Sequence, residues 1–401
     1  MRRIIVTFAA AMVLFSSCIK RSCVQQNMVS HDIKVAEQQV GYQLQVVEKS
    51  GKILFPRTVF DNEIQYAPID DWTSGFFPGA LWYMYELTGN KKWENAAEKF
   101  TLRLDSVKYI TWHHDVGFII HSSYGIGYDI TKNPAYKAVI IQAAKSLATR
   151  FRPVPGVIQS WDENRGWQAK RGWMCPVIID NMMNLELLFQ ASDLSGDSTY
   201  RKMAISHANV TMANHFRKDF SCYHVVDYDK IKGGVRSKGT AQGFSDESSW
   251  ARGQAWALYG FTICYRETKD PKYLDLVDKI YHFIFTNKTM PADLVPYWDF
   301  NAPNIPNEPR DASSAAIMAS ALYELVALGR PQYKETADKI MQSLSGPAYL
   351  AIVGTNGNFL LMHSVGSIPH DSEVDVPLIY ADYYFLEALA RKIELEKSEK
   401  K

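Results

Sequence analysis

The chain has 401 residues, of which 47% are hydrophobic and 22% charged, the ordinary range of a globular protein. Its 44 Lys and Arg residues against 43 Asp and Glu residues leave a net charge of +1, and no basic run occurs outside the C-terminal tail. This balance excludes an overall field that would attract nucleic acid or an anionic membrane, so we expect neither as a partner. Aromatic residues reach 13%, and flat rings suit sugar-binding sites, although most aromatic side chains pack in protein cores.

The first residues have the pattern of a targeting segment. Two arginines, an apolar run over 4–15 and two small residues precede Cys18, and the run is too short for an ordinary membrane-spanning helix. This pattern predicts a lipoprotein signal, with a lipid anchor at Cys18 as the membrane attachment and the periplasm or outer membrane as the location. Because Phe15 stands where leucine is usual, a plain cleaved export signal stays the alternative. We predict a signal and tether over 1–25 and a single catalytic domain over 26–401.

Helical periodicity dominates from Asp32 onward. Apolar residues recur at helical intervals, as in Leu276, Ile280 and Ile284. No long stretch alternates as a strand would, and only the short segment 357–361 resembles a hairpin arm. The twelve predicted helices cover 33–49, 77–88, 91–107, 117–130, 134–151, 178–193, 198–216, 249–267, 271–287, 311–328, 331–346 and 375–395.

A short motif recurs between these helices. The stretch 88–93 returns at 131–136, 195–200 and 268–273, and more faintly at 328–333. In the clear copies an Asn or Asp is placed to cap the next helix, proline, where present, suits its first position, and the aromatic residue packs inward. Recurring helical hairpins indicate a solenoid or a closed toroid. Twelve helices in six hairpins favour an all-α fold, the (α/α)6 barrel.

Longer, polar and aromatic-rich segments fall between the other helices. In a toroid they would gather at the end opposite the tight turns, and loops at such an end commonly carry the functional site. These segments are 50–76, 108–116, 152–177, 221–249, 288–310 and 347–374.

Two motifs at predicted helix starts carry carboxylates beside aromatic or histidine residues. Trp72 follows two aspartates at a loop end, a pattern that a turn and helix cap would also explain. His113, His114 and Asp115 precede the helix predicted at 117–130, where Asp115 could serve only as an N-cap. Because no third ligand stands at a recognisable spacing from the two histidines, we predict no metal.

Four further residues combine charge or aromatic surface with a helical or loop setting. Asp180 lies within an apolar run, and burial raises the pKa of a carboxyl toward the range useful for proton transfer, although a helix cap is the simpler alternative. His224 lies in a long loop. Arg252 and Trp256 are four residues apart and share one helix face, where they offer a fork for a carboxylate and a stacking surface. A cation–π pair in the core is the alternative for these two.

Taken in order, these motifs resemble those of the unsaturated glucuronyl hydrolases of glycoside hydrolase family 88. The resemblance covers about residues 30–395, and its specificity comes from the ordered set. The family has an (α/α)6 barrel, in agreement with the helix count. The matching stretches are Trp72–Gly79, His114–Phe118, Ser160–Asp162, Ile179–Leu185 and Trp250–Trp256.

The resemblance implies a role for nine residues. Asp180 is similar to the general acid/base of the family, and Asp115 is similar to its second essential carboxylate near the sugar. No metal or organic cofactor is implied. The implied substrate-binding residues are His224, Gln242, Arg252 and Trp256, together with Trp72, Trp161 and His114.

The resemblance also implies a reaction. Polysaccharide lyases leave a 4,5-unsaturated uronic acid at the non-reducing end, and its double bond belongs to an enol ether. In the family an aspartate protonates C4 and water adds at C5, after which the ring opens and the aglycone is released. A glycosaminoglycan-derived oligosaccharide is therefore the expected substrate. The alternatives are an unsaturated rhamnogalacturonyl hydrolase acting on pectin fragments, and a helical glycan-binding lipoprotein without catalysis.

A late segment bears on sulfation of the substrate. Family members that prefer sulfated chondroitin resemble one another in a Ser-x-x-Ser-x-Lys stretch. Here Ser364 and Ser367 are followed by Pro369, where the lysine would stand. Because the missing cation removes a charge-assisted contact, we expect this segment to give a weak preference for sulfate on the aglycone.

Overall fold

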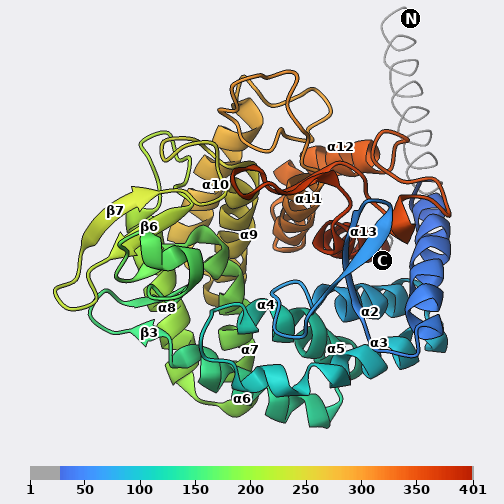
Figure 1. Cartoon of the computed structure of the whole chain (residues 1–401), viewed down its shortest axis with the longest axis horizontal. Coiled ribbons are helices and arrows are strands. Elements are labelled where there is room, and N and C mark those ends of the chain that lie inside the picture. Colours follow the sequence, from blue (N-terminus) through green and yellow to red (C-terminus); the bar gives the residue numbers. More distant parts are fainter. Residues whose placement is uncertain (1–27, 400–401) are drawn as a thin grey trace, which may run out of the picture.

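In the computed structural model, which describes residues 28–399, the helices form two concentric layers around one axis (Figure 1). Each inner helix is followed by an outer helix, apart from α13, whose outer neighbour is the helix over 28–49 (Figure 1). The inner layer contains α2 (Phe76–Thr88), α4 (Val116–Ile120) with α5 (Ile126–Thr131), α7 (Leu185–Ser195), α9 (Ala251–Thr268), α11 (Ala312–Ala327) and α13 (Ile379–Ser398). The outer layer contains the helix over 28–49, α3 (Lys91–Arg103), α6 (Pro134–Ala148), α8 (Ser198–Asn214), α10 (Pro271–Thr286) and α12 (Lys334–Leu344).

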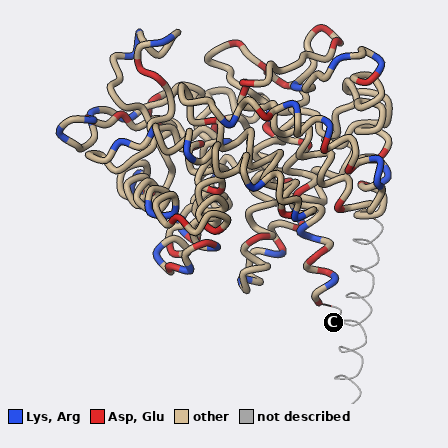
Figure 2. The backbone as a smooth tube through the Cα atoms, turned by 90° about the horizontal axis from the view of Figure 1, so that it is seen from below, with Lys and Arg blue, Asp and Glu red and all other residues tan. Residues whose placement is uncertain are grey.

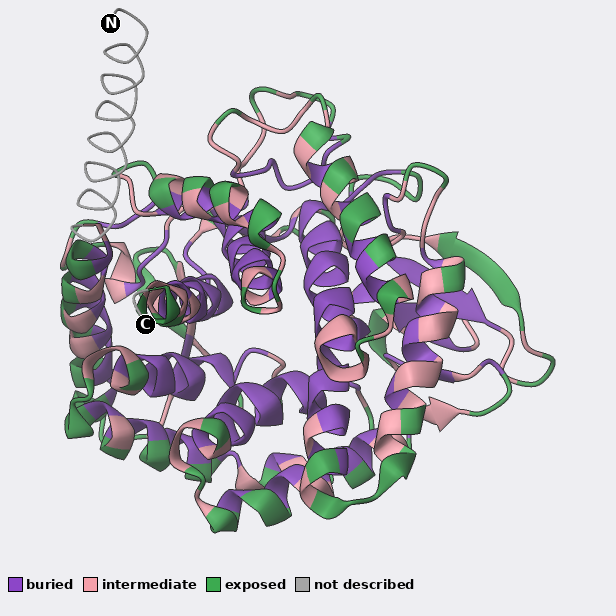
Figure 3. Cartoon of the chain, turned by 180° about the vertical axis from the view of Figure 1, so that it is seen from behind, coloured by how far each residue is buried: buried purple, intermediate pink, exposed green. Residues whose placement is uncertain are grey.

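The inner layer closes into a ring because the last helix packs on the first inner one. Helix α13 contacts both α11 and α2, and α9 contacts α11 on the other side. The inner helices are buried on nearly every side, as Figure 3 shows, whereas the outer helices present one exposed face. This confirms the all-α (α/α)6 barrel, with an α-helix in each of the twelve predicted segments. In the segment predicted over 178–193 the α-helix begins only at Leu185, after a 3-10 helix over Ile179–Asn184. The predicted signal over 1–25, with Cys18, lies outside the described residues.

The tight turns between hairpins have the predicted caps. The side chain of Asn90 accepts a hydrogen bond from Lys92 N at 3.1 Å, and Asp270 accepts one from Lys272 N at 3.1 Å. Asn133 and Asp197 cap α6 and α8 in the same way. An Asn or Asp at this position satisfies a backbone N–H that the first helical turn leaves without a partner. The repeated motif is therefore a helix-capping device.

Nine short strands lie in the long segments, at the end of the barrel opposite the tight turns. The sequence did not predict these strands. Their sequences show no clear alternation of apolar and polar residues because the strands are short. In addition, β6 is buried on both faces, whereas β7 is largely exposed. The prediction of a hairpin arm at 357–361 was wrong, because residues 356–358 form a single 3-10 turn. The strands are β1 (Phe55–Phe60), β2 (Glu63–Ala67), β3 (Phe151–Arg152), β4 (Val157–Ile158), β5 (Pro176–Ile178), β6 (Val225–Tyr228), β7 (Val235–Gly239), β8 (Ser364–Ser367) and β9 (Ser372–Val376).

Lys and Arg residues are interspersed with Asp and Glu residues along the backbone (Figure 2). Within residues 28–399 no helix is long and apolar enough to cross a membrane.

We predict that one glycine of the inner ring is required for close packing. A Cβ at Gly260 of α9 would lie 2.3 Å from the Cβ of Met182, so Gly260→Ala should lower the free energy of unfolding by about 1–3 kcal/mol. Gly41 is the matched control: its nearest neighbour would be Trp93 at 3.7 Å, and alanine favours the helix, so Gly41→Ala should be neutral or slightly stabilising. Denaturant unfolding of both variants measures this. Equal stability of Gly260→Ala and the wild type would contradict it.

Candidate active site

A small antiparallel sheet brings Asp180 and His224 together. Strand β5 pairs with β6 so that Ile178 lies opposite Val225. Asp180 follows the end of β5 and His224 precedes the start of β6, so the two side chains meet at one end of the sheet. The Asp180 Oδ2 atom lies 3.6 Å from His224 Nε2. This pairing joins residues that are 44 positions apart in the sequence.

The third strand of the sheet fixes the orientation of the His224 ring. Strand β7 ends at Gly239, opposite Val225, and the chain then turns back over the ring. The Nδ1 atom of His224 accepts hydrogen bonds from the backbone N–H groups of Ala241 at 3.0 Å and Gln242 at 3.2 Å. Burial lowers the pKa of His224 well below its usual value. The ring is therefore neutral, with its proton on Nε2, the atom that faces Asp180.

Asp180 is held in surroundings that favour its protonated form. Its side chain is 13% exposed, and burial raises its pKa to about 7. The positive charge of Arg252 opposes this rise, whereas the negative charge of Asp115 adds to it. A carboxyl with a pKa near neutrality can both donate and accept a proton in one reaction cycle.

Asp115 lies near Asp180, but its pKa is shifted in the opposite direction. Burial alone would raise its pKa, yet His114 and His113 outweigh burial, and the pKa of Asp115 falls below its usual value. The carboxylate oxygens lie 3.3 Å from His114 Nε2 and 3.4 Å from His113 Nδ1. Asp115 precedes α4 without capping it through its side chain, so the simple cap does not explain this residue.

Asn184 sets the tautomer of His114. The Oδ1 atom of Asn184 accepts from Phe118 N at 2.8 Å, which leaves its amide nitrogen to donate to His114 Nδ1 at 2.8 Å. The remaining ring nitrogen of His114 then carries the proton and faces Asp115. The asparagine of the Ile179–Leu185 stretch thus positions the second carboxylate through a histidine, a role that the sequence did not predict.

Arg252 connects the helix α9 to the segment 364–367. Its Nη1 donates to Val365 O and its Nη2 donates to Gly366 O at 2.7 Å. The Gly366 oxygen also accepts from Gln242 Nε2 at 3.3 Å. The alternative prediction of a cation–π pair between Arg252 and Trp256 was wrong. The guanidinium lies instead over Trp250, 4.6 Å from the ring centre.

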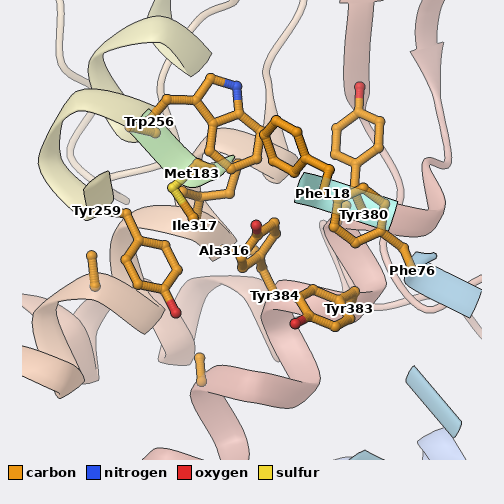
Figure 4. Close-up of a cluster of buried hydrophobic side chains, with 14 of the residues drawn as sticks. Phe76, Phe118, Met183, Trp256, Tyr259, Ala316, Ile317, Tyr380, Tyr383 and Tyr384 are labelled. Carbon is orange, nitrogen blue, oxygen red and sulfur yellow. The ribbon is translucent and has the colours of Figure 1, made fainter. Parts of the chain in front are cut away.

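Aromatic rings surround these polar groups on the axis side of the barrel. Trp256 packs edge-on against Phe118 at 5.3 Å, and Trp72 packs against Tyr380 at 4.7 Å. Figure 4 shows Trp256, Phe118 and Tyr380 in one cluster with Met183 beneath them. Burial is the largest cause of the raised pKa of Asp180, and Trp256 of this cluster lies close to Asp180.

Several buried polar atoms of these residues have no hydrogen-bond partner within residues 28–399. Such atoms are costly in a protein interior, and their concentration here indicates groups that await a polar ligand. They are His113 Nε2, His114 Nε2, Asp180 Oδ2, His224 Nε2, Arg252 Nε and Trp256 Nε1.

Trp161 belongs to a group of three tryptophans that the sequence did not single out as a group. It lies edge-on to His224 at 6.2 Å, stacks with Trp173 at 5.8 Å and contacts Trp167 at 5.1 Å. Trp167 and Trp173 come from the loop between β4 and β5, and their contacts with Trp161, which lies beside His224, connect them to the site.

A salt bridge that was not predicted joins the Trp72 loop to the β8–β9 hairpin. Arg57 of β1 donates to Asp71 Oδ2 at 2.6 Å and to Glu373 Oε1 at 2.6 Å. Asp71 precedes Trp72 directly, and Glu373 lies on β9.

The structure brings all nine predicted residues to the end of the barrel that the long segments form.

No group of three or more His, Cys, Asp or Glu side chains in the described part of the chain is arranged to hold a metal ion. The three described cysteines, Cys175, Cys222 and Cys264, are free and buried.

Comparison with known proteins identifies the family. The model of glycosyl hydrolase family 88 matches residues 36–387. This chain belongs to that family. An unsaturated glucuronyl hydrolase of Formosa agariphila is 44% identical over 375 residues, which cover 90% of this chain and 92% of the relative.

Solved structures of family 88 relatives agree with this assignment. The structure of an unsaturated glucuronyl hydrolase specific for heparin has a TM-score of 0.88 and 43% identity, and the match covers 92% of this chain and 98% of that one. A variant of the Streptococcus agalactiae unsaturated glucuronyl hydrolase, complexed with dGlcA-GalNAc6S, has a TM-score of 0.76 and 30% identity over 91% of each chain.

We predict that Asp180 makes the fold less stable as the pH rises. Its folded pKa of about 7 lies above the unfolded value of 3.8, so its contribution is fully present below pH 3.8 and is lost between that value and about pH 7. Asp180→Asn removes this loss and should raise the free energy of unfolding above pH 7, by up to about 4 kcal/mol.

The melting temperatures of the wild type and Asp180→Asn between pH 4 and 8 measure this effect. Asp115→Asn is the matched control with the opposite sign: the pKa of Asp115 is depressed, so its removal should cost stability at neutral pH and less as the pH falls. A gain for Asp180→Asn that did not change with pH would contradict the assignment.

Proposed function

We propose that this family 88 enzyme removes the 4,5-unsaturated uronic acid from the non-reducing end of glycosaminoglycan oligosaccharides produced by lyases. The observation that carries the proposal is the Asp180 carboxyl, which is buried beside a neutral His224, near an ionised Asp115, with a pKa of about 7. The names of the relatives support the glucuronyl substrate over the rhamnogalacturonyl alternative. A glycan-binding protein without catalysis would have no use for this pair of carboxyl groups.

Asp180 acts as acid and then as base in the proposed reaction. Its proton is transferred to C4 of the unsaturated ring, and the positive charge that develops at C5 is shared with the ring oxygen. Water attacks C5 and gives its proton to the Asp180 carboxylate. The resulting hemiketal opens, and the former anomeric carbon releases the aglycone sugar with a free hydroxyl group. Asp180 has regained its proton from the attacking water, and one water molecule is consumed in the whole reaction.

The other residues hold the sugar in place for this proton transfer. Asp115, fixed by His114, is placed to accept hydrogen bonds from sugar hydroxyls, because an ionised carboxylate is an acceptor only. His224 Nε2, Arg252 Nε and Trp256 Nε1 are free donors on the same side as Asp180. Gln242 and the rings of Trp72 and Trp161 complete the proposed contact set.

We predict that Asp180→Asn is folded and binds unsaturated disaccharide but has a kcat at least about 10³-fold lower, because an amide cannot transfer the proton in either step. Asp115→Asn should also be severely impaired. Glu163→Gln is a matched carboxyl-to-amide control on the Trp161 loop, where Glu163 pairs with Lys230, and it should keep a kcat near that of the wild type. Loss of ultraviolet absorbance of the double bond measures kcat, and circular dichroism checks the helices. Near-normal turnover by Asp180→Asn would remove it from the proton-transfer role.

We also propose that the chain is exported and carries a lipid on Cys18, from the arginines, apolar run and small residues that precede it. Mass spectrometry of the mature protein should find the lipid on an N-terminal Cys18. Cys18→Ser should abolish lipidation, whereas the control Cys23→Ser should retain it. An unmodified terminus beyond Cys18 would contradict the anchor and leave only a cleaved export signal.

A further inference from the structure

Asp311 is buried at the start of α11, where it connects that helix to Arg252 and to β8. Its Oδ2 atom lies 3.5 Å from Arg252 Nη1, and its Oδ1 atom accepts a hydrogen bond from Val365 N at 3.3 Å. Arg252 Nη1 in turn donates to Val365 O. The three residues thus form a closed triangle, which links the first turn of α9, the start of α11 and the strand β8.

A helix cap accounts for only part of the contacts that Asp311 makes. Its Oδ1 atom accepts from Ser313 N at 3.2 Å and from Ser313 Oγ at 2.6 Å, and its Oδ2 atom accepts from Ser314 Oγ at 2.6 Å. An asparagine or a serine would serve equally well as a cap. The negative charge matters for Arg252, because both side chains are only 1% exposed and a buried guanidinium without a counter-charge is strongly unfavourable.

The charge of Arg252 acts on the carboxyl that gives the proton. Burial raises the pKa of Asp180, and Arg252 is the strongest influence in the opposite direction. The other titratable groups around Asp180 are Asp115 before α4, and His224 and Cys222 before β6. Burial keeps the His224 ring and the Cys222 thiol uncharged. Arg252 and Asp115 are therefore the charges that set the ionisation of Asp180.

Among the described residues, Asp311 is the only carboxylate within ion-pair distance of Arg252. On the α13 side the guanidinium lies 5.2 Å from the ring centre of Tyr380, whose hydroxyl stays neutral because burial raises its pKa. Glu373, a second carboxylate that acts on Tyr380, is paired with Arg57. The balance of charge at Arg252 therefore depends on Asp311.

We propose that Asp311 is a positioning residue of the hydrolase: it holds the Arg252 guanidinium on the carbonyl groups of β8 and balances its charge, so that Arg252 does not pair with Asp180. The proposal rests on the proposed function, in which Asp180 begins the reaction as a protonated acid. Without Asp311, the positive charge of Arg252 would act on Asp180 uncompensated and favour its carboxylate. The proton for C4 would then be lost at a lower pH.

Asp311→Asn tests the charge while it keeps an oxygen for the cap. The basic limb of kcat/KM requires protonated Asp180, so this limb should move to lower pH by at least about half a unit. Asp311→Glu retains the charge and should keep the limb closer to that of the wild type. The matched control is Asp227→Asn. Asp227 is also buried, accepts from two backbone N–H groups and pairs with Arg236, so its replacement should cost stability without moving the limb.

A carbon-13 NMR titration of the Asp180 carboxyl, assigned with Asp180→Asn, measures the same shift without turnover. The midpoint should fall in Asp311→Asn relative to the wild type. In a background of Arg252→Met, where the cation is absent, adding Asp311→Asn should no longer lower it. An unchanged midpoint in Asp311→Asn would overturn the proposal, and so would a fall of the same size in the Arg252→Met background.

The double variant also decides the case in which Asp311→Asn alone does not fold. Removing both charges of a buried pair costs less than removing one, so Arg252→Met with Asp311→Asn should fold where the single variant fails. Failure of both would overturn the proposal and leave Asp311 as a cap of α11. If the wild type cleaved no unsaturated disaccharide, the proposed function would fail, while the NMR midpoints would still decide the role of Asp311.

Discussion

The site depends on keeping one carboxyl out of water while leaving it one free oxygen. Burial raises the pKa of Asp180 to about 7, and within residues 28–399 its Oδ2 atom has no hydrogen-bond partner. His224 can stand at 3.6 Å without forming an ion pair because backbone N–H groups occupy its other nitrogen and burial keeps the ring neutral. A charged histidine at the same place would hold Asp180 as a carboxylate, and the proton for C4 would be lost.

The two carboxyl groups have different pKa shifts because different elements hold them. Asp180 follows a strand and lies close to Trp256, one of the rings labelled in Figure 4. Asp115 precedes α4 and faces two histidines, one of which is locked by Asn184. Burial acts on both, but the local donors decide the sign for Asp115. Pairs of titratable groups with opposed shifts are the usual sign of an acid/base site.

The sequence predicted what local rules determine. Helical periodicity and caps such as Asn90 and Asp270 depend on neighbours within a few residues, so the helices and tight turns could be placed from the sequence. The resemblance then indicated which polar residues share the site. The small sheets and the Arg57 salt bridge could not be predicted, because they depend on pairing between distant segments: Arg57 and Glu373 are 316 residues apart. The cation–π partner of Arg252 was wrong for a local reason: Trp250, only two residues earlier, is the N-cap of α9 and lies outside the helical face that a spacing of four residues describes.

The β8–β9 hairpin shows how these distant contacts hold the site in one shape. Asp371, Glu373 and Asp375 all have positive φ values, 48°, 56° and 55°, a conformation that costs a non-glycine residue roughly 1 kcal/mol or more. In this hairpin Arg57 binds the Glu373 carboxylate, and Arg252 binds the carbonyls of β8. Arg57 also binds Asp71 beside Trp72, so the hairpin and the Trp72 loop are fixed by one side chain. The contacts on both strands of the hairpin thus offset its strain, and they hold Ser367 beside His370, which lies against Trp167 of the tryptophan group.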